Sequence, residues 1–213
     1  MNIINLLIAL FSYLLGSLPF ALIIVRLTSG KDVRKEGSGN VGAMNSFDVT
    51  KKKWIGILVL ILDVLKGVVA VLFARMIGDG FPAIAIAAIF SVLGHNFSIY
   101  IKFRGGRGLA TAAGAFIMIN PLIVIFWILM YFAGWFIIKK NVHIANLTAS
   151  ICAPLMIYYT PQLLLDRMSF AGHVPVMNLL ITGAIVSFLI ILRHIKPLME
   201  LMKNSDELKK LRK

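Results

Sequence analysis

The feature that most constrains this chain is a succession of apolar blocks, most of them long enough to cross a lipid bilayer. A transmembrane helix needs about 20 largely apolar residues, with a range of roughly 17–25. Such blocks recur along the chain, and shorter polar segments separate them. A helix satisfies its backbone hydrogen bonds internally, which lipid requires. The pattern therefore predicts an all-α integral membrane protein.

Seven blocks are candidate spans. They cover residues 3–27, 54–76, 81–101, 109–119, 122–138, 144–159 and 176–192. The fourth block is short and stops at Asn120-Pro121, so we expect a short or broken span that neighbouring helices shield. No linker or internal repeat is evident, and we treat residues 1–213 as a single domain.

Composition agrees with a membrane protein. Of the 213 residues, 59% are hydrophobic and 15% are charged. Soluble domains average about 45–50% apolar residues and about 25% charged residues. The single cysteine, Cys152, excludes a disulfide framework and a cysteine-based metal site. The four histidines have no metal-ligand spacing. We therefore expect neither a metal nor a cofactor.

The positive charges are sorted along the chain. Lysine and arginine total 22 against 9 acidic residues, a net charge of +13. Four segments, 26–53, 101–108, 139–140 and 193–213, hold 19 of the 22 cations. Basic loops favour the cytoplasmic side, and seven spans would put all four segments there, with the N-terminus outside and the C-terminus in the cytoplasm. This sorting argues against a nucleic-acid partner, which the net charge alone would suggest.

The first polar loop, residues 36–45, is rich in glycine. Glycines let backbone N–H groups approach an anion closely, and Ser38, Asn40 and Asn45 add side-chain hydrogen-bonding groups. The loop is a candidate binding site for a polar substrate. A flexible turn between two spans is an equally weighted alternative from the residues alone.

The second polar loop, residues 102–111, leads into the fourth block. Gly105, Gly106 and Gly108 stand within four positions, next to Arg107 and two further cations. A glycine-rich turn that opens a helix predicts a phosphate site, because the helix N-terminus offers unpaired N–H groups and a positive dipole end. A basic loop that only sets topology is the alternative, but topology needs no glycines.

Ionisable groups within or beside the spans are few. Asp63 and Lys66 are spaced i, i+3 in the second block, and we favour a structural ion pair over a substrate contact. His95 and His194 stand near span ends on the predicted cytoplasmic side, close in sequence to polar segments. No serine–histidine–aspartate arrangement or nucleophile elbow can be argued, so the chemistry should need little help with proton transfer.

Motifs that carry a family resemblance follow one another along nearly the whole chain. They are GSLPF at 16–20, DVRK at 32–35 leading into GSGNVGAMN at 37–45, LDVLKG at 62–67, GH at 94–95, KFRGGRGLAT at 102–111 and RH at 193–194. In this combination the chain resembles the bacterial acyl-phosphate:glycerol-3-phosphate acyltransferases, the PlsY family. The resemblance implies a seven-helix enzyme of the bacterial cell membrane with a cytoplasmic active site.

The resemblance also implies a reaction. A fatty acyl group would pass from acyl phosphate to the 1-hydroxyl of glycerol 3-phosphate and give lysophosphatidic acid, without metal or cofactor. Expected partners are these two substrates and the lipid bilayer, and we expect a monomer. Acyl phosphate is already activated, so holding two phosphates and aligning a hydroxyl with a carbonyl would be the main task. The substrate's own phosphate could accept the hydroxyl proton; which phosphate binds which loop stays open.

Site residues carry over by position, except Asn45, which is a candidate as a polar side chain of the first loop. Ser38 and His194 match residues that we expect to act in catalysis. The expected substrate and phosphate contacts are Asn40, Asn45, Gly105, Gly106, Arg107, Gly108 and Asn146. Arg107 stands where the family usually has lysine, and Asn146 near the position of a family serine.

Three positions depart from the family pattern. Met44 stands where the family usually has threonine, Asp48 near the place of an arginine, and Pro197 in place of an asparagine. The departures leave two alternatives open, a catalytically divergent paralogue or a transporter of an anionic phosphate compound. Many transporters contain paired inverted halves, and none is evident here.

Overall fold

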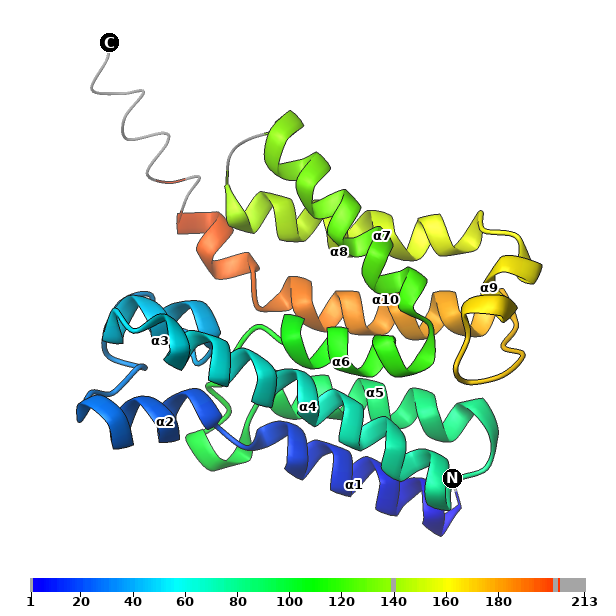
Figure 1. Ribbon diagram of the computed structural model, residues 1–213, viewed down its shortest axis with the longest axis horizontal. Coiled ribbons are helices and arrows are strands. Elements are labelled where there is room, and N and C mark those ends of the chain that lie inside the picture. Colours follow the sequence, from blue (N-terminus) through cyan, green and yellow to red (C-terminus); the bar gives the residue numbers. More distant parts are fainter. Residues whose placement is uncertain (1, 139–140, 201–202, 204–213) are drawn as a thin grey trace.

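The computed structural model describes residues 2–138, 141–200 and 203, and all regular structure in this part of the chain is helical (Figure 1). Lys139, Lys140 and the basic tail from residue 201 onward, except Lys203, lie outside the described residues. The predicted all-α class is therefore confirmed for the described part.

The described part of the chain contains ten labelled α-helices, and residues 195–200 after the last of them are also helical. The labelled helices are α1 (Ile3–Ser17), α2 (Phe20–Ser29), α3 (Ala43–Thr50), α4 (Lys53–Ile77), α5 (Gly80–Asn96), α6 (Leu109–Ile119), α7 (Pro121–Ala133), α8 (Val142–Tyr158), α9 (Gln162–Met168) and α10 (Val176–Leu192). A 3₁₀ turn, Ile99–Ile101, follows α5, and a π-helical turn, Gly134–Ile138, ends α7.

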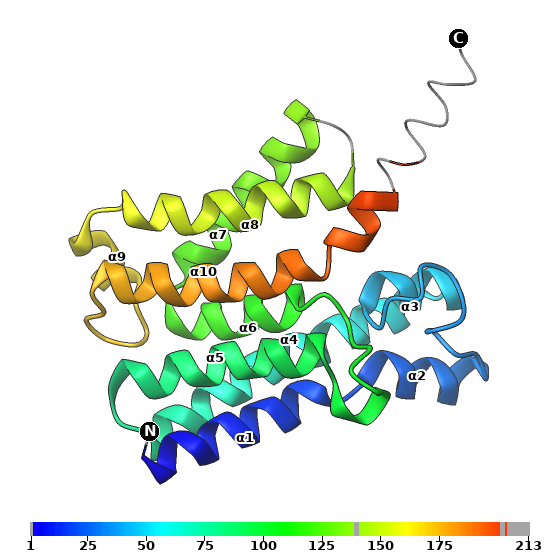
Figure 2. The same cartoon turned by 180° about the vertical axis from the view of Figure 1, so that it is seen from behind.

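The long helices lie side by side, and their ends gather at two opposite sides of the molecule. Helices α1, α4 and α5 form one group, and α6 lies between it and the pair α8 and α10 (Figures 1 and 2). One end holds α2, α3 and the loop before α6, and the other holds the N-terminus and α9. Both polar loops of the sequence therefore come to the same end.

Glycines allow two helix pairs to approach closely. A methyl group on Gly67 would lie 2.1 Å from a backbone carbonyl oxygen of α6, and one on Gly114 would lie 2.0 Å from a carbonyl oxygen of α4. Gly16 and Gly94 make the same reciprocal contact between α1 and α5. Close packing through small residues is how helices associate where lipid removes the hydrophobic drive.

The surface of the bundle is apolar. Ile57, Ile61 and Leu65 on α4 are 56%, 50% and 43% exposed, and such a face suits contact with lipid. Three helical segments are long and apolar enough to cross a membrane, namely Ile3–Ser29, Lys53–Ile77 and Gly80–Ile101, or four if α8 and α9 form one bent span. The segments Leu109–Ile119, Pro121–Ile137 and Val176–Leu192 are apolar but shorter.

Several boundaries differ from the predicted blocks. The first block is not one helix, because the chain breaks at Leu18-Pro19 between α1 and α2, where proline lacks the N–H that a continuous helix would need. Helix α3 begins at Ala43, within the predicted loop 36–45. Helix α9 follows α8 at an angle of 112° and has no counterpart among the predicted elements.

Candidate functional site

The two polar loops meet at the end of α5. The N–H groups of Gly105 and Gly106 donate to the carbonyl oxygens of Asn96 and His95, at 3.2 and 3.0 Å. A methyl group on Gly106 would lie 2.2 Å from His95 Nε2 and 2.7 Å from the carbonyl oxygen of Val41 in the first loop. The second loop is therefore pressed between α5 and the first loop.

These bonds revise the predicted phosphate cradle. The N–H groups of Gly105 and Gly106 point to protein carbonyls, so they hold the loop rather than an anion. Gly108 is the N-cap of α6 with φ of 82°, a left-handed conformation that favours glycine. It makes no side-chain capping bond, and the next three residues, beginning with Leu109, lack an intrahelical acceptor. The open anion-binding groups are thus at the start of α6.

Arg193 fixes the second loop from the other side. Its Nε donates to the carbonyl oxygen of Gly106 at 3.0 Å, and one terminal nitrogen donates to that of Gly105 at 2.7 Å. The guanidinium also lies over the Phe97 ring, 5.6 Å from its centroid. Arg193 therefore positions the loop. We did not include it among the predicted site residues, although its place beside His194 at a span end was a usable signal.

Arg107 is a half-buried cation that forms no ion pair within the described residues. Burial lowers the pKa of its guanidinium, and the nearby charge of Arg193 lowers it further. The guanidinium stays protonated in spite of this lowering, because arginine is not deprotonated in proteins. An uncompensated cation at a helix N-terminus favours a bound anion.

His194 is buried, with an exposed fraction of 1%. Its Nδ1 lies 2.9 Å from the carbonyl oxygen of Ile190, an atom that only accepts, so Nδ1 carries the proton when the ring is neutral. Burial lowers the pKa of His194 to about 4. At neutral pH, Nε2 is consequently a free acceptor, and it has no partner among the described residues.

Asn146 and His143 lie one turn apart near the start of α8. Asn146 is 2% exposed, and its Oδ1 has no partner in the described part of the chain. The His143 ring contacts the His194 ring, with 5.6 Å between centroids. Arg107 acts electrostatically on both imidazoles. The structure thus brings the predicted residues Arg107 and His194 together and places predicted Asn146 beside His143, which was not predicted as a site residue.

The first loop is organised by one side chain. Asn45 Nδ2 lies 2.8, 3.2 and 3.0 Å from the carbonyl oxygens of Val33, Glu36 and Asn40, and its Oδ1 accepts from the Ser38 N–H at 2.8 Å. With all its polar atoms used, Asn45 shapes the loop and is not free to contact substrate as we predicted. Turn glycines at 37 and 39, with φ of 61° and 68°, complete the fold of the loop.

Ser38 and Asn40 are the remaining predicted residues. The Ser38 side chain is exposed and its hydroxyl makes no hydrogen bond to the described residues, and Asn40 is half-buried. Both are thus accessible from solvent. The hydroxyl of Ser38 is free to meet a ligand.

A buried charged cluster lies beneath the loops. Lys66 Nζ is 2.7 Å from Asp63 Oδ1, and His95 Nδ1 is 3.7 Å from the same oxygen. The predicted ion pair of Asp63 and Lys66 is therefore present. These residues line a cavity of only about 10 Å³ together with Gly105 and Gly106, which has room for about one water. The cluster supports the loop, and no substrate fits within it.

A larger apolar cavity begins at the start of α6. It has a volume of about 150 Å³ and lies between α6, α7, α8 and α10. Leu109, which follows the N-cap of α6, lines it, and so does Ile190, whose carbonyl faces His194. Polar anion-binding groups and an apolar cavity therefore adjoin, an arrangement suited to an amphiphilic anion. Among the described residues, no group of three or more possible metal ligands is found.

Comparison with known proteins agrees with this geometry. Residues 6–204 match the family model described as glycerol-3-phosphate acyltransferase. The chain is 37% identical to a glycerol-3-phosphate acyltransferase of Aquifex aeolicus over 188 residues, 88% of this chain and 90% of the relative. It is 39% identical over 148 residues to glycerol-3-phosphate acyltransferase 2 of Moorella thermoacetica, 70% of this chain and 75% of the relative.

Solved structures show the same fold. The crystal structure of PlsY, an integral membrane glycerol 3-phosphate acyltransferase, in its glycerol 3-phosphate form superposes with a TM-score of 0.76 at 34% identity and covers 94% of this chain and 92% of that one. The lysophosphatidic acid form gives a TM-score of 0.74 at 32% identity, with the same coverage. The chain is therefore an integral membrane protein that belongs to the glycerol-3-phosphate acyltransferase family.

Proposed function

We propose that this protein transfers a fatty acyl group from acyl phosphate to the 1-hydroxyl of glycerol 3-phosphate and so forms lysophosphatidic acid. The observation that carries the proposal is that the open start of α6 adjoins the apolar cavity between α6, α7, α8 and α10. Arg107, which has no ion-pair partner among the described residues, stands directly before this helix start. An acyl phosphate needs both environments, one for its headgroup and one for its chain. The relatives' names and the two PlsY forms supply the acceptor and the product.

Binding is the first part of the proposed mechanism. Arg107 and the N–H groups at the start of α6 hold a phosphoryl group, since donors at a helix N-terminus and a guanidinium both suit phosphate. Arg193, which grips the carbonyl oxygens of Gly105 and Gly106, keeps that loop in register. Positioning of two reactants can supply about 7–11 kcal/mol of the barrier, which suits an acyl donor that is already activated.

The chemical step moves one acyl group and one proton. The 1-hydroxyl oxygen of glycerol 3-phosphate attacks the carbonyl carbon, the bond from that carbon to the phosphate oxygen breaks, and the departing phosphate takes the hydroxyl proton. His194 Nε2, an acceptor without a partner among the described residues, orients glycerol 3-phosphate by accepting a hydrogen bond from its 2-hydroxyl group, so the proton of the 1-hydroxyl stays available to the departing phosphate. Ser38 stabilises the charge that develops on the carbonyl oxygen.

The proposed membrane arrangement has seven crossings, with the N-terminus outside and the site in the cytoplasm of a bacterial cell membrane. Its supports are the basic segments 26–53 and 101–108, which lie at the end of the bundle that holds α2 and α3, and the return of the chain to this end after α5 and α10 (Figure 1). The short helices α6, α7 and α10 would cross where neighbouring helices shield them. We propose that the protein acts as a monomer.

Two of the three departures lie on one helix face. Met44 and Asp48 are spaced i, i+4 on α3 and both are exposed. Pro197 follows His194 by three residues. None of them replaces a residue of the Arg107, His143, Asn146 and His194 group, so we propose that they tune substrate affinity and leave the reaction in place.

An assay of the purified protein tests the function. Protein in detergent is given long-chain acyl phosphate and radiolabelled glycerol 3-phosphate, and labelled lysophosphatidic acid is measured; acyl-coenzyme A replaces the donor in a parallel reaction. Product with acyl phosphate only is expected. If a folded sample gave no product with either donor, the proposal would be refuted. If product formed with acyl-coenzyme A alone, the proposed use of acyl phosphate as donor would be refuted.

A labelling experiment tests the topology. Single cysteines replace Ser38, Arg104 or Gly172 in a Cys152→Ala protein, and an impermeant thiol reagent is added to intact cells. We expect labelling at position 172 only. Labelling of position 38 or 104 in intact cells would place the loops outside.

A further inference from the structure

His143 stands at the candidate site but has no role in the proposed reaction. It is the second residue of α8, and its N–H donates to the side chain of the N-cap, Asn141, at 2.8 Å. The same amide oxygen accepts from Ile144 at 3.3 Å. The cap therefore fixes the backbone of the first helical turn, which carries His143.

The imidazole of His143 has an unused polar atom on its buried side. Its Nδ1 is buried and has no hydrogen-bond partner in the described part of the chain. The same holds for Nε2 of His194, whose ring is 5.6 Å away, and for Oδ1 of Asn146, one turn further along α8. Buried polar atoms are normally paired. His194 Nε2 and Asn146 Oδ1 accept hydrogen bonds and suit a substrate hydroxyl, whereas His143 Nδ1 can carry the ring proton and then needs an acceptor.

The charges around His143 favour an anion as the acceptor for its Nδ1. Arg107 acts on His143 and His194, and Arg193 acts on His194 and Arg107. Glu200 is the acidic group that acts on His143, and it is exposed. Arg107 of the second loop is thus a cation near both imidazoles, and Arg193 is a cation near that of His194. A phosphoryl oxygen accepts hydrogen bonds from several donors at once.

We propose that His143 is a further substrate-binding residue, whose Nδ1 donates a hydrogen bond to the substrate phosphoryl group held by Arg107. The proposal rests on the proposed function for the identity of the substrates. Glycerol 3-phosphate and acyl phosphate both carry the required group. His143 approaches it from α8, where its ring contacts that of His194.

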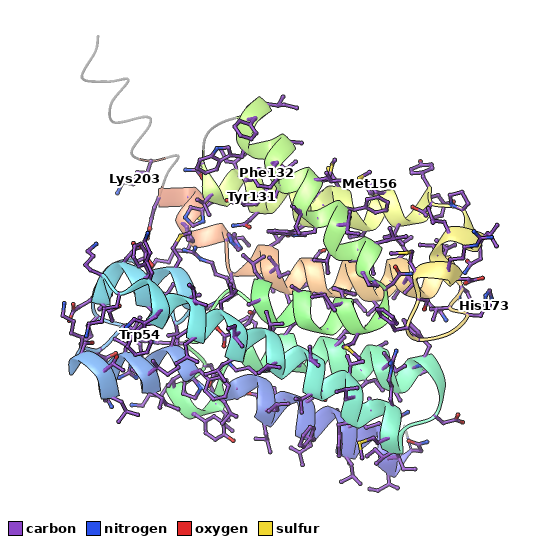
Figure 3. All side chains as sticks on the ribbon, in the orientation of Figure 1. Trp54, Tyr131, Phe132, Met156, His173 and Lys203 are labelled. Carbon is purple, nitrogen blue, oxygen red and sulfur yellow. The ribbon has the colours of Figure 1, made fainter. Side chains whose placement is uncertain are left out.

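Two substitutions separate hydrogen bonding from packing. His143→Phe keeps a ring against His194 and removes Nδ1, whereas His143→Asn loses the ring and keeps a donor near the position of Nδ1. His173→Phe is the matched control, because His173 lies at the opposite end of the molecule, where its side chain is 67% exposed and pairs with Asp166 (Figure 3). All three are purified in detergent and their melting temperatures are compared with that of the unmodified protein.

Steady-state kinetics gives the first test. In His143→Phe we expect KM to rise about 10-fold for one substrate, the loss of one hydrogen bond to a charged group, with kcat within about 2-fold. His143→Asn and His173→Phe should stay within about 3-fold of the unmodified protein. The substrate whose KM rises is the one whose phosphoryl group His143 contacts. Unchanged KM for both substrates in His143→Phe would overturn the proposal, as would equal losses in His143→Phe and His143→Asn with lowered melting temperatures.

Binding of inorganic phosphate gives a second test that needs no turnover. We expect calorimetric titration to show about 10-fold weaker phosphate binding to His143→Phe than to His173→Phe. Equal binding would refute the contact. If the unmodified protein were inactive with both substrates yet lost phosphate affinity in His143→Phe, the proposed reaction would fail and the contact would stand.

Discussion

Gly106→Ala tests whether the second loop is held by contact with α5 and the first loop. The added methyl group would lie 2.2 Å from His95 Nε2 and 2.7 Å from the carbonyl oxygen of Val41. The distance from the new methyl carbon to His95 Nε2 must increase by about 1.2 Å, from 2.2 Å to the 3.4 Å at which ordinary contact begins. Both hydrogen bonds from Arg193 to this loop would be disturbed by the shift. A displacement of about 1 Å can cost about 100-fold in rate.

The assay is steady-state transfer of the acyl group with each substrate varied in turn. We expect kcat/KM to fall about 100-fold in Gly106→Ala, with changes in both kcat and KM because the whole loop moves. Gly172→Ala is the control, since Gly172 has φ of 77° and nothing within 4 Å of an added methyl group. It carries backbone strain far from the site and should lose stability without losing rate.

A double-mutant cycle identifies the cause. His95→Ala removes the closest atom that the new methyl group meets, so Gly106→Ala should cost less in a His95→Ala protein than in the unmodified one. The relief should be partial, because the Val41 carbonyl oxygen remains. A folded Gly106→Ala protein with normal kcat and KM would refute the reasoning. If the effects of Gly106→Ala and His95→Ala on kcat/KM were strictly additive, contact with His95 would not be the cause of the loss.

Three further predictions concern single residues. Ser38→Ala should lower kcat by about 100-fold, the loss typical of one donor to a developing oxyanion, and full activity would remove Ser38 from the mechanism. Arg193→Lys keeps the charge but cannot donate hydrogen bonds to the Gly105 and Gly106 carbonyl oxygens together. The melting temperature should therefore fall by roughly 3 °C, and kcat/KM should also fall. An unchanged melting temperature would contradict the role of Arg193 in holding this loop. His194 has a pKa of about 4 because burial opposes protonation of its ring. It should therefore stay neutral, with the proton on Nδ1, as the pH falls from 8 to 5.5. A titration midpoint near 6.5 in nitrogen NMR would contradict this.

The bundle could be predicted from its apolar blocks, because lipid leaves the backbone few alternatives to a helix. Breaks within the blocks were harder to predict. Leu18-Pro19 separates α1 from α2, yet prolines also occur inside membrane helices, and α8 continues through Pro154. Helix α3 was missed because its eight residues are too polar to form an apolar block and too few for a periodicity to stand out.

The candidate site could be predicted in position but not in detail. Glycine spacing and charge located the second loop, yet the N–H groups of Gly105 and Gly106 point inward, which depends on where α5 ends. Asn45 was expected to bind substrate because an amide in a loop is free until the fold gives it partners. His143 and Arg193 act across helix contacts, which a single sequence does not report.

The four contacts of Asn45 have a consequence for the speed of each catalytic cycle. One amide joins backbone groups of residues 33, 36, 38 and 40, so the first loop has its working shape before any substrate arrives. The entropy lost in ordering that loop belongs to the folding reaction and is not lost again at every turnover. An acceptor molecule that reaches this face from the aqueous side meets a rigid template, and the encounter needs no slow rearrangement of the protein.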